Sequence, residues 1–412
     1  MRDIKDIAKI IDENHGKLYL VGGAVRDQFL GIENHDEDYC VTGISVNKFK
    51  ELFPDAITRG KAFAIFDIDK KEFALARKER KTGLGHKEFE IETDESITIK
   101  EDLARRDITI NAIAKNVLTG EIIDPYGGVK DLKNGIIKAV TEHFKEDPLR
   151  AYRVARFASK FEFKVDKETI KMINSLKDEL STISVERVYA EFSKSLLTEK
   201  PSVFFDVLRQ SEILDVHFEE IHKLIGAEQP PQYHPEGDAY NHTMIVLDKV
   251  AKDTKNYSEE RKLEIRFAAL VHDIGKGETP KEEYPHHYMH EARGKEIVKK
   301  MGHRLKLPTN LIKCGQTACL EHMKGGMFYN MKPGKQVEFI ERVDKSLLKL
   351  DGLQIIVNAD NNDAKDFATI GNKCLNEING KYINKKSNTI TGQNFGAKLH
   401  QERVEWIKHE LT

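Results

Sequence analysis

The fold of the N-terminal part of this chain is decided by residues 18–39, LYLVGGAVRDQFLGIENHDEDY. The apolar run 18–21 at the start of this stretch is typical of a buried strand. Gly22 and Gly23 follow, and two glycines allow a backbone to approach a phosphate group closely. A helix that begins here would add free N–H groups and the positive end of its dipole. The stretch therefore predicts a strand, a phosphate-binding turn and a helix.

Three acidic residues, Asp36, Glu37 and Asp38, close the same stretch. We expect a strand over residues 36–41, in which alternation places Asp36 and Asp38 on one face. Two neighbouring carboxylates repel each other unless a cation lies between them, and Mg²⁺ is commonly held by carboxylates together with substrate phosphates. A phosphate-binding turn followed by a magnesium site is typical of a nucleotidyltransferase, in which metal ions activate a hydroxyl and stabilise the leaving pyrophosphate.

The pattern GGAVRD followed by DED resembles the signature of the polymerase-beta-like superfamily, specifically the class II tRNA nucleotidyltransferases and the bacterial poly(A) polymerases. This resemblance implies that Asp36 and Asp38 are catalytic and bind Mg²⁺. It also implies that Gly22, Gly23 and Arg26 hold a nucleoside triphosphate.

The composition is that of a helix-rich globular protein, with 33% charged and 39% hydrophobic residues in 412. The sequence contains no run of about 18 apolar residues, so we expect no membrane span, and the amphipathic N-terminus does not resemble a signal peptide. The four cysteines show no CxxC spacing and predict reduced thiols in a cytoplasmic protein. The formal net charge of −2 does not favour nucleic-acid binding, so any RNA contact must come from local basic faces.

A hairpin of residues 64–76, turned at Lys70 and Lys71, is expected to complete a small mixed sheet with the two strands above. A third metal-binding carboxylate could come from this hairpin or from its Glu72. The polar, glycine-rich segment 77–89 that follows is expected to be a mobile loop.

A further cluster of polar residues lies in DLARRDITINA, residues 102–112. On a helix, Asp107 and Asn111 would be one turn apart, with Arg105 and Arg106 one turn earlier, which predicts a polar-lined pocket. The segment is similar to the second motif of the nucleotidyltransferase family. That similarity implies that these four residues hold the ribose and the triphosphate.

Residues 141–225 show the three- and four-residue apolar spacing of helices. Within them, Asp147 and Arg150 offer one fixed hydrogen-bond acceptor beside one fixed donor. Cytosine and adenine present an amino donor beside a ring-nitrogen acceptor, whereas guanine and uracil present the reverse. Because unpaired buried polar groups discriminate strongly between ligands, this pair can select C and A over G and U.

The surrounding segment, EDPLRAYRVARFASKF, closely resembles the amino-acid template motif of the family. The resemblance implies that the acceptor–donor pair selects first CTP and then ATP without a nucleic-acid template. Arg153 and Arg156 continue near the same face and would support the site or contact RNA. The later segment SVERVYAE resembles the next motif, in which Glu186 and Arg187 would support the site.

Histidine becomes dense after a proline-rich connection at residues 229–237. His272 and Asp273 are adjacent at a predicted helix end, His242 lies upstream and Asp360 downstream, and such a mixed N/O ligand set suits a divalent transition metal. The pattern resembles the HD phosphohydrolase superfamily, which implies that these four residues bind the metal. Ni²⁺, Mn²⁺, Co²⁺ and Mg²⁺ are all left open.

The same resemblance gives roles to three further residues. His290 and His322 would complete the metal site or bind the scissile phosphate, and Lys276 would steer that phosphate. His286 and His287 are weaker candidates, because two histidines in a loop are usually solvated. The metal would lower the pKa of bound water and polarise a phosphate ester, which predicts hydrolysis.

The chain is thus expected to be an α+β protein of four parts. These are a small mixed-sheet nucleotidyltransferase head at 1–140, an all-α neck and body at 141–225, an all-α HD domain at 226–365 and a helical tail at 366–412. Trp406 is expected in a packing helix of that tail.

The joint order of the motifs is that of the bacterial CCA-adding enzymes that carry an HD domain, and the resemblance covers nearly the whole chain. It implies template-independent addition and repair of the 3′-terminal CCA of tRNA with CTP and ATP. It also implies that the HD domain hydrolyses 2′,3′-cyclic phosphates, 2′-nucleotides and phosphomonoesters.

Three alternatives stay open on the sequence. The chain could be a poly(A) polymerase or an A-adding enzyme, although the poly(A) polymerases end in basic tails instead of an HD domain. It could be an HD phosphohydrolase with a nucleotide-sensing head, or a non-catalytic RNA-binding protein, which fits poorly with the net charge of −2. Both a monomer and a homodimer are compatible with the sequence.

Overall fold

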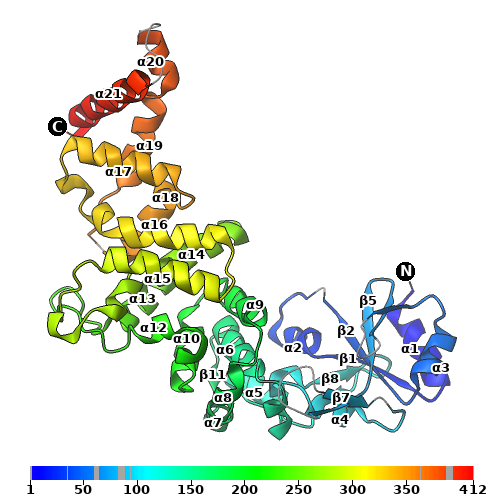
Figure 1. Cartoon of the computed structure of the whole chain (residues 1–412). Coiled ribbons are helices and arrows are strands. Elements are labelled where there is room, and N and C mark those ends of the chain that lie inside the picture. Colours follow the sequence, from blue (N-terminus) through cyan, green and yellow to red (C-terminus); the bar gives the residue numbers. More distant parts are fainter. Residues whose placement is uncertain are drawn as a thin grey trace. The chain divides into compact units, whose positions relative to one another are not determined.

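The structure, a computed structural model, describes residues 2–34, 36–59, 65–81, 89–92, 94–361, 363–386 and 393–411. The chain divides into two compact units. Unit 1 comprises Met1–Glu191 and Val203–Val216, and unit 2 comprises Phe192–Ser202 and His217–Thr412. The expected division into four parts stays a prediction. Figure 1 labels most of the helices and several of the strands of the two units.

Unit 1 is built on a seven-stranded sheet with the strand order β3-β4-β5-β2-β1-β8-β9. β2 and β5 run parallel, and the other neighbouring strands of this sheet run antiparallel. The predicted mixed sheet is therefore confirmed. The strands are β1 Lys17–Val21, β2 Asp38–Thr42, β3 Ile57–Arg59, β4 Ile65–Ile68, β5 Lys71–Leu75, β8 Ala114–Asn116 and β9 Ile122–Ile123.

Strand β1 is buried on both faces, which explains why its sequence is a continuous apolar run. Leu18 and Leu20 join one core together with residues of helices α1 (Ile4–Glu13) and α3 (Val46–Leu52). Tyr19 and Val21 join the core of the opposite face. The glycine turn then leads into helix α2, Gly23–Leu30, as predicted.

The acidic strand begins later than predicted. β2 starts at Asp38, so Asp36 precedes it and the two carboxylates do not share a strand. The register pairs Val21 of β1 with Asp38, and the chain turns away at Gly22, where φ is 68°. Residues before Asp38 therefore have no partner on β1 to extend the strand.

The predicted hairpin is confirmed, but its turn is shifted by one residue. β4 and β5 are joined by Asp69 and Lys70, both with positive φ, and Lys71 is already part of β5. The segment expected as a loop also differs. It contains β6, Lys78–Lys81, paired antiparallel with β7, Phe89–Glu92, while residues 82–88 lie outside the described part of the chain.

The helix predicted over residues 102–112 is wrong. Helix α4, Ile99–Ala104, ends earlier, and a short 3-10 turn follows at Thr109–Asn111. Ile108 forms a β-bridge with Ala139, and the N–H of Thr109 donates to the carbonyl of Lys138. This long-range pairing holds the backbone extended where the local spacing favoured a helix.

The rest of unit 1 is helical, as expected, apart from a small parallel sheet. β10, Ile136–Ile137, pairs with β11, Lys164–Val165, so the neck is not purely α-helical. The further helices here are α5 Gly128–Asn134, α6 Arg150–Phe161, α7 Lys167–Ser175, α8 Lys177–Leu180, α10 Ser202–Gln210 and α11 Leu214–His217, together with α9 Val185–Leu196, which continues into unit 2 after Glu191.

Unit 2 is mainly helical in its described residues, and helices α13, α14, α16, α17, α18, α19 and α21 contribute buried side chains to one apolar core. The C-terminal helix packs on that core through the buried Ile407 and the partly buried Trp406, whose Nε1 donates to Glu377 at 2.8 Å. The packing helix predicted in the tail is thus confirmed. The helices of unit 2 are α12 Glu219–His222, α13 Ala239–Asp253, α14 Glu259–Val271, α15 His290–Arg304, α16 Thr309–Gly326, α17 Pro333–Lys345, α18 Lys349–Asp360, α19 Phe367–Glu377, α20 Gly380–Lys386 and α21 Gln393–Leu411.

Candidate active sites

Unit 1 contains a cavity of about 870 Å³, a volume suited to a nucleotide. The glycine turn, the start of β2, the segment after α4, and helices α6 and α9 all contribute to its lining. Every residue predicted to bind the nucleotide or to be catalytic in its transfer lines this cavity, namely Gly22, Gly23, Arg26, Asp36, Asp38, Arg105, Arg106, Asp107, Asn111, Asp147, Arg150, Arg153 and Arg156. Segments far apart in the sequence therefore converge on one place.

The lining has more cationic than anionic side chains, although the whole chain carries a net charge of −2. It holds eight arginines together with Lys160. Such a concentration of guanidinium groups favours polyanions, because each group can donate paired hydrogen bonds to phosphate oxygens. The cavity thus provides the local basic face that an RNA or triphosphate ligand requires.

Carboxylates gather at one edge of the cavity. Asp36 and Asp38 both line it, and Asp38 stands in register with Glu72 on the parallel neighbour strand β5. The surrounding protein raises the pKa of Asp38 by excluding water, Asp36 and Glu72 raise it further, and Arg106 offsets part of the shift. Because these carboxylates repel one another, the edge suits a divalent cation such as Mg²⁺.

The glycine turn is pressed against the arginines of the site. Gly22 has a φ of 68°, and a Cβ at this position would lie 2.7 Å from Nη1 of Arg106. Asp102 is buried and accepts hydrogen bonds from Arg105 at 2.7 Å and from Arg106 at 3.3 Å. Asp102 was not among the predicted site residues, and it fixes the two arginines that the sequence did predict.

Arg26 is buried and fully engaged with protein groups. Its guanidinium donates to Asp27 at 2.8 Å and to Asn111 at 2.5 Å. It also lies over the ring of Phe157, 5.5 Å from the centroid, and over that of Phe161, 4.9 Å away. Arg26 therefore ties helix α2 to helix α6, in addition to lining the cavity.

Asp107 and Asn111 lie side by side although they do not share a helix. Nδ2 of Asn111 donates to Asp107 at 3.1 Å, and Nε of Arg153 donates to the other carboxylate oxygen at 2.8 Å. Burial alone would raise the pKa of Asp107, but Arg153 and Asn111 outweigh burial and lower this pKa to about 2. The carboxylate is thus charged and locked in place at neutral pH.

The two residues of the predicted template have different partners. The carboxylate of Asp147 pairs with Arg187 at 3.0 Å, as expected of a supporting residue. The guanidinium of Arg150 donates to the carbonyl oxygens of His143 at 2.6 Å and Arg105 at 2.5 Å. Backbone and side-chain contacts therefore fix both groups at the wall of the cavity, while Arg156 pairs with Glu191 at 2.5 Å.

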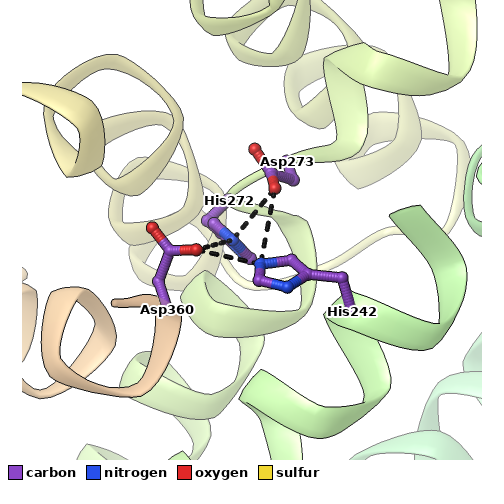
Figure 2. A group of neighbouring side chains, drawn as sticks. All are labelled: His242, His272, Asp273 and Asp360. Atoms are coloured by element: carbon purple, nitrogen blue, oxygen red, sulfur yellow. Dashed lines mark hydrogen bonds and ion pairs between the residues drawn. The ribbon is translucent and has the colours of Figure 1, made fainter. Parts of the chain in front are cut away.

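The second site lies in unit 2, where His242, His272, Asp273 and Asp360 converge (Figure 2). Nε2 of His242 lies 2.9 Å from Asp360 and 3.8 Å from Asp273. Nε2 of His272 lies 3.3 Å from Asp273 and 3.7 Å from Asp360. The structure thus brings together all four predicted ligands, from helices α13 and α18 and from the end of α14.

The imidazoles are oriented by hydrogen bonds on their far side. Nδ1 of His272 lies 2.7 Å from the carbonyl oxygen of Ala269, and Nδ1 of His242 lies 2.6 Å from the carboxylate of Glu236. Because these oxygens only accept, each Nδ1 carries the proton and each Nε2 presents its lone pair to the cluster. Nε2 of His272 is buried without a hydrogen-bond partner among the described residues, as a metal ligand would be. The cluster therefore fits a divalent metal ion.

Lys276, His290 and His322 also lie at this cluster. Nζ of Lys276 contacts Asp273 at 2.6 Å and Gln229 at 2.7 Å, and it helps to hold the pKa of Asp273 well below its usual range against the effect of burial. His287 stays outside the cluster because both its nitrogens have other partners, Thr279 and the carbonyl of Glu228.

Glu236, the hydrogen-bond partner of the predicted ligand His242, was not among the residues predicted for the site. It belongs to the proline-rich connection at residues 229–237, in which the sequence predicts no site residue. Its position six residues before His242 is a usable signal, since metal-binding histidines often donate their second N–H to a carboxylate.

Three protein families match successive parts of the chain. Residues 18–138 match the family described as Poly A polymerase head domain, and residues 162–225 match the Probable RNA and SrmB- binding site of polymerase A. Residues 239–356 match the HD domain.

Curated relatives extend over most of the chain. The "Multifunctional CCA protein" of Acinetobacter baylyi is 38% identical over 406 residues, which cover 94% of this chain and 96% of the relative. The protein of the same name from Acinetobacter baumannii is 41% identical over 406 residues, with the same two shares.

Solved structures share the fold at lower identity. A structure titled "The structure of CCA-adding enzyme apo form II" has a TM-score of 0.66 and 21% identity, and the match covers 98% of this chain and 92% of that one. A complex of a CCA-adding enzyme with ATP has a TM-score of 0.65 and 21% identity, over 98% and 90%. A tRNA nucleotidyltransferase with a primer tRNA and an ATP analogue has a TM-score of 0.60 and 23% identity, over 90% and 99%.

Two further sequence expectations concern the whole chain. The four cysteines are all free, as predicted, and the structure also buries each of them. Among the described residues, no helix combines the length and the apolar character needed to cross a membrane.

Proposed function

This chain belongs to the family of multifunctional CCA proteins and is a CCA-adding tRNA nucleotidyltransferase, and on that premise we propose how its two sites divide the work. The cavity of unit 1 adds C, C and A to the 3′ end of tRNA from CTP and ATP, without a nucleic-acid template. The observation that supports this proposal is that every residue predicted to bind the nucleotide or to be catalytic in its transfer lines one arginine-rich cavity. The names of the relatives do not favour a poly(A) polymerase or a sensor head.

Asp36 and Asp38 hold Mg²⁺ at the edge of the cavity in this proposal. Magnesium would supply Lewis-acid stabilisation of the charge on the transferred phosphoryl group. Gly22 and Gly23 let the backbone approach the triphosphate, and Arg105 and Arg106 neutralise it. Their fixed orientation by Asp102 supports this role, because pre-organised donors need no rearrangement during the reaction.

Asp147 and Arg150 read the incoming base. The rigidity of the two groups supports this role, since a fixed acceptor beside a fixed donor leaves guanine and uracil with unpaired polar groups. The neighbouring arginines, Arg153 and Arg156, keep the surrounding carboxylates in place.

The test is nucleotide incorporation on a tRNA that lacks its CCA end, with each labelled nucleotide alone and then with CTP and ATP together, in Mg²⁺. We expect two C followed by one A and then arrest. Long A tracts from ATP alone would instead support poly(A) synthesis. As a control, Asp36→Ala should abolish pyrophosphate release from CTP.

Unit 2 is a metal-dependent phosphohydrolase in this proposal. His242, His272, Asp273 and Asp360 bind a divalent transition metal such as Ni²⁺, because their N/O ligand set suits such an ion. Its substrates are 2′,3′-cyclic phosphates, 2′-nucleotides and phosphomonoesters, such as those at damaged tRNA ends. The free, buried thiols support a reducing, cytoplasmic location.

A further inference from the structure

Unit 2 contains a cavity of about 630 Å³ between helices α15 and α16, which pack side by side (Figure 1). None of the described residues that line this cavity belongs to either of the two sites above. We propose that the α15–α16 cavity binds the phosphodiester backbone of the tRNA to which the chain adds CCA. The inference rests on the proposed function, because it takes tRNA as the substrate.

The lining of the α15–α16 cavity is basic. Among the described residues it combines four lysines and one histidine with a single carboxylate, that of Glu296. The chain as a whole carries a net charge of −2, so this local excess of positive charge is not a property of the general surface. Such an excess favours a polyanion as the ligand. The five basic side chains are all exposed, and they are Lys295, Lys299, His303, Lys306 and Lys313.

Three of these lysines have no ionic partner in the protein. Within the described part of the chain, the ammonium groups of Lys295, Lys299 and Lys313 form no hydrogen bond or ion pair. In contrast, Lys335 pairs with Glu338 at 2.8 Å on helix α17. Lys295 and Lys299 are also one turn apart on α15, where like charges repel and destabilise the helix. Since the fold supplies no counter-charge, an external anion would provide it.

The positions of the lysines suit neighbouring phosphates of one strand. Four residues of an α-helix rise about 6 Å, which is comparable with the distance between neighbouring phosphates of an RNA strand. Gly302 continues the same face of α15, and a Cβ there would lie 2.5 Å from Cγ1 of Ile312 on α16. This glycine therefore lets the two helices approach closely, so that Lys313 of α16 lines the same cavity as Lys295 and Lys299.

The first turn of α16 adds hydrogen-bond donors. Thr309, the first residue of this 18-residue helix, lines the cavity, and the N-cap Pro308 makes no side-chain hydrogen bond to the first turn. The N–H groups at the start of a helix lack partners within the helix, and they lie at the positive end of its dipole. Both properties favour a phosphate group. The lysines and the helix start thus favour the same ligand.

The lining suits RNA better than a protein partner. Protein interfaces are anchored by large apolar side chains, above all aromatic ones. The described residues of the lining include no phenylalanine, tyrosine or tryptophan, and the apolar Leu307 and Ile312 are buried, with exposed fractions of 6% and 8%. An RNA backbone requires only cations and hydrogen-bond donors, because it is bound through its phosphate oxygens.

The experiment measures binding of the full-length chain to a tRNA that lacks its CCA end, by fluorescence anisotropy over a range of KCl concentrations. The test variant combines Lys295→Gln, Lys299→Gln and Lys313→Gln. Each lost phosphate contact lowers the slope of log Kd against log salt by about one, so we expect the slope to fall by about three. The Kd at about 0.1 M KCl should rise at least about tenfold.

The matched control combines Lys252→Gln, Lys332→Gln and Lys345→Gln. These three lysines are exposed, belong to unit 2 and lie outside the cavity, so the net charge changes equally in both variants. We expect the control to bind tRNA with the slope and Kd of the parent. Circular dichroism checks the folding of both variants.

A second measurement uses the parent protein alone and does not depend on the folding of a variant. Acetylation of lysines is followed by mass spectrometry without ligand, with the tRNA and with polyglutamate. We expect the tRNA to protect Lys295, Lys299 and Lys313 from acetylation, while Lys252 and Lys345 stay reactive. Polyglutamate should protect none of them.

The outcomes separate this inference from the proposed function. Parent-like binding by the test variant, or an equal loss in the control, overturns the assignment of tRNA to the cavity. Protection by polyglutamate as strong as that by tRNA also overturns it and indicates an acidic protein instead. A parent that binds tRNA through these lysines but adds no nucleotide overturns the proposed function and leaves the binding cavity standing.

Discussion

Oε1 of Glu236 lies 2.6 Å from Nδ1 of His242, and this hydrogen bond turns Nε2 of the imidazole toward Asp360, 2.9 Å away. Glu236→Ala should therefore weaken metal binding by unit 2 about 10- to 100-fold, as is typical when the partner of a ligating histidine is removed. Calorimetric titration with Mn²⁺ measures this change. His234→Ala is the matched control, because His234 contacts the same carboxylate at 3.1 Å but is not one of the predicted ligands. Equal affinities of Glu236→Ala and the parent protein would contradict the orienting role.

The register of the sheet predicts a part for Glu72 in the magnesium site. It stands beside Asp38 on a parallel strand, whereas Asp67 lies one strand farther away and pairs with Arg59 at 2.7 Å. Glu72→Gln should raise the Mg²⁺ concentration needed for half-maximal nucleotide incorporation by about tenfold, equivalent to the loss of about 1.4 kcal/mol. Asp67→Asn should leave it unchanged. The same increase in both variants would show that the hairpin carboxylates affect Mg²⁺ binding only through their negative charge and not as ligands.

The pairing of Asp147 with Arg187 predicts how base selection fails. Asp147→Ala should lower the preference for CTP over GTP by at least about 10²-fold. The reason is that the acceptor group of guanine would no longer face the carboxylate of Asp147, which is itself an acceptor. Arg187→Ala should change the preference in the same direction but less, since it frees the carboxylate without removing it. Single-turnover incorporation of each nucleotide measures the ratio. An unchanged ratio in Asp147→Ala would refute the template role.

The contacts of Arg26 predict a loss of stability. Arg26→Ala leaves the buried Asp27 and Asn111 without their donor and should lower the free energy of unfolding of unit 1 by about 3 kcal/mol. Thermal unfolding without nucleotide measures this effect. Lys160→Ala is the control, because Lys160 also lies over Phe161, at 5.2 Å, but is exposed. If Arg26→Ala is as stable as the parent protein, Arg26 contributes to ligand binding and not to the stability of the fold.

His217 predicts a pH dependence of stability. Burial lowers its pKa to about 4, with Arg304 adding to the shift, against 6.5 in the unfolded chain. The unfolded state therefore takes up a proton first as the pH falls below 6.5, and stability decreases. The contribution between pH 7 and pH 5 is about 2 kcal/mol. Denaturant titrations at the two pH values measure the decrease in the free energy of unfolding between pH 7 and pH 5. We expect this decrease to be about 2 kcal/mol smaller in His217→Gln than in the parent. An equal loss in both proteins would contradict the shift.

Local patterns in the sequence identified most of the residues predicted for nucleotide and metal binding. The strand, glycine turn and helix around Gly22 follow from apolar runs and backbone freedom, which act over a few residues. The ligands His272 and Asp273 are neighbours in sequence, so their spacing alone was informative. The mixed sheet, the hairpin and the packing helix were predicted in the same way.

The errors of prediction share one physical cause. The strand begins at Asp38 because β1 ends at Val21, and the helix expected over residues 102–112 is replaced by pairing with the segment around Ala139. In both places a contact with a distant strand outweighed the local preference, which contributes only a fraction of a kcal/mol per residue.

The sequence by itself determined which residue types are available for nucleotidyl transfer and for metal binding. Only the tertiary structure decided which of these residues lie in contact with one another. His242 and Asp360 are 118 residues apart, and the approach of His290 and His322 to Asp273 depends on α15 and α16 packing together. The orientation of His242 depends on Glu236 in the same way. Side-chain contacts of this kind result from the burial of a common core, and no spacing along the chain encodes them.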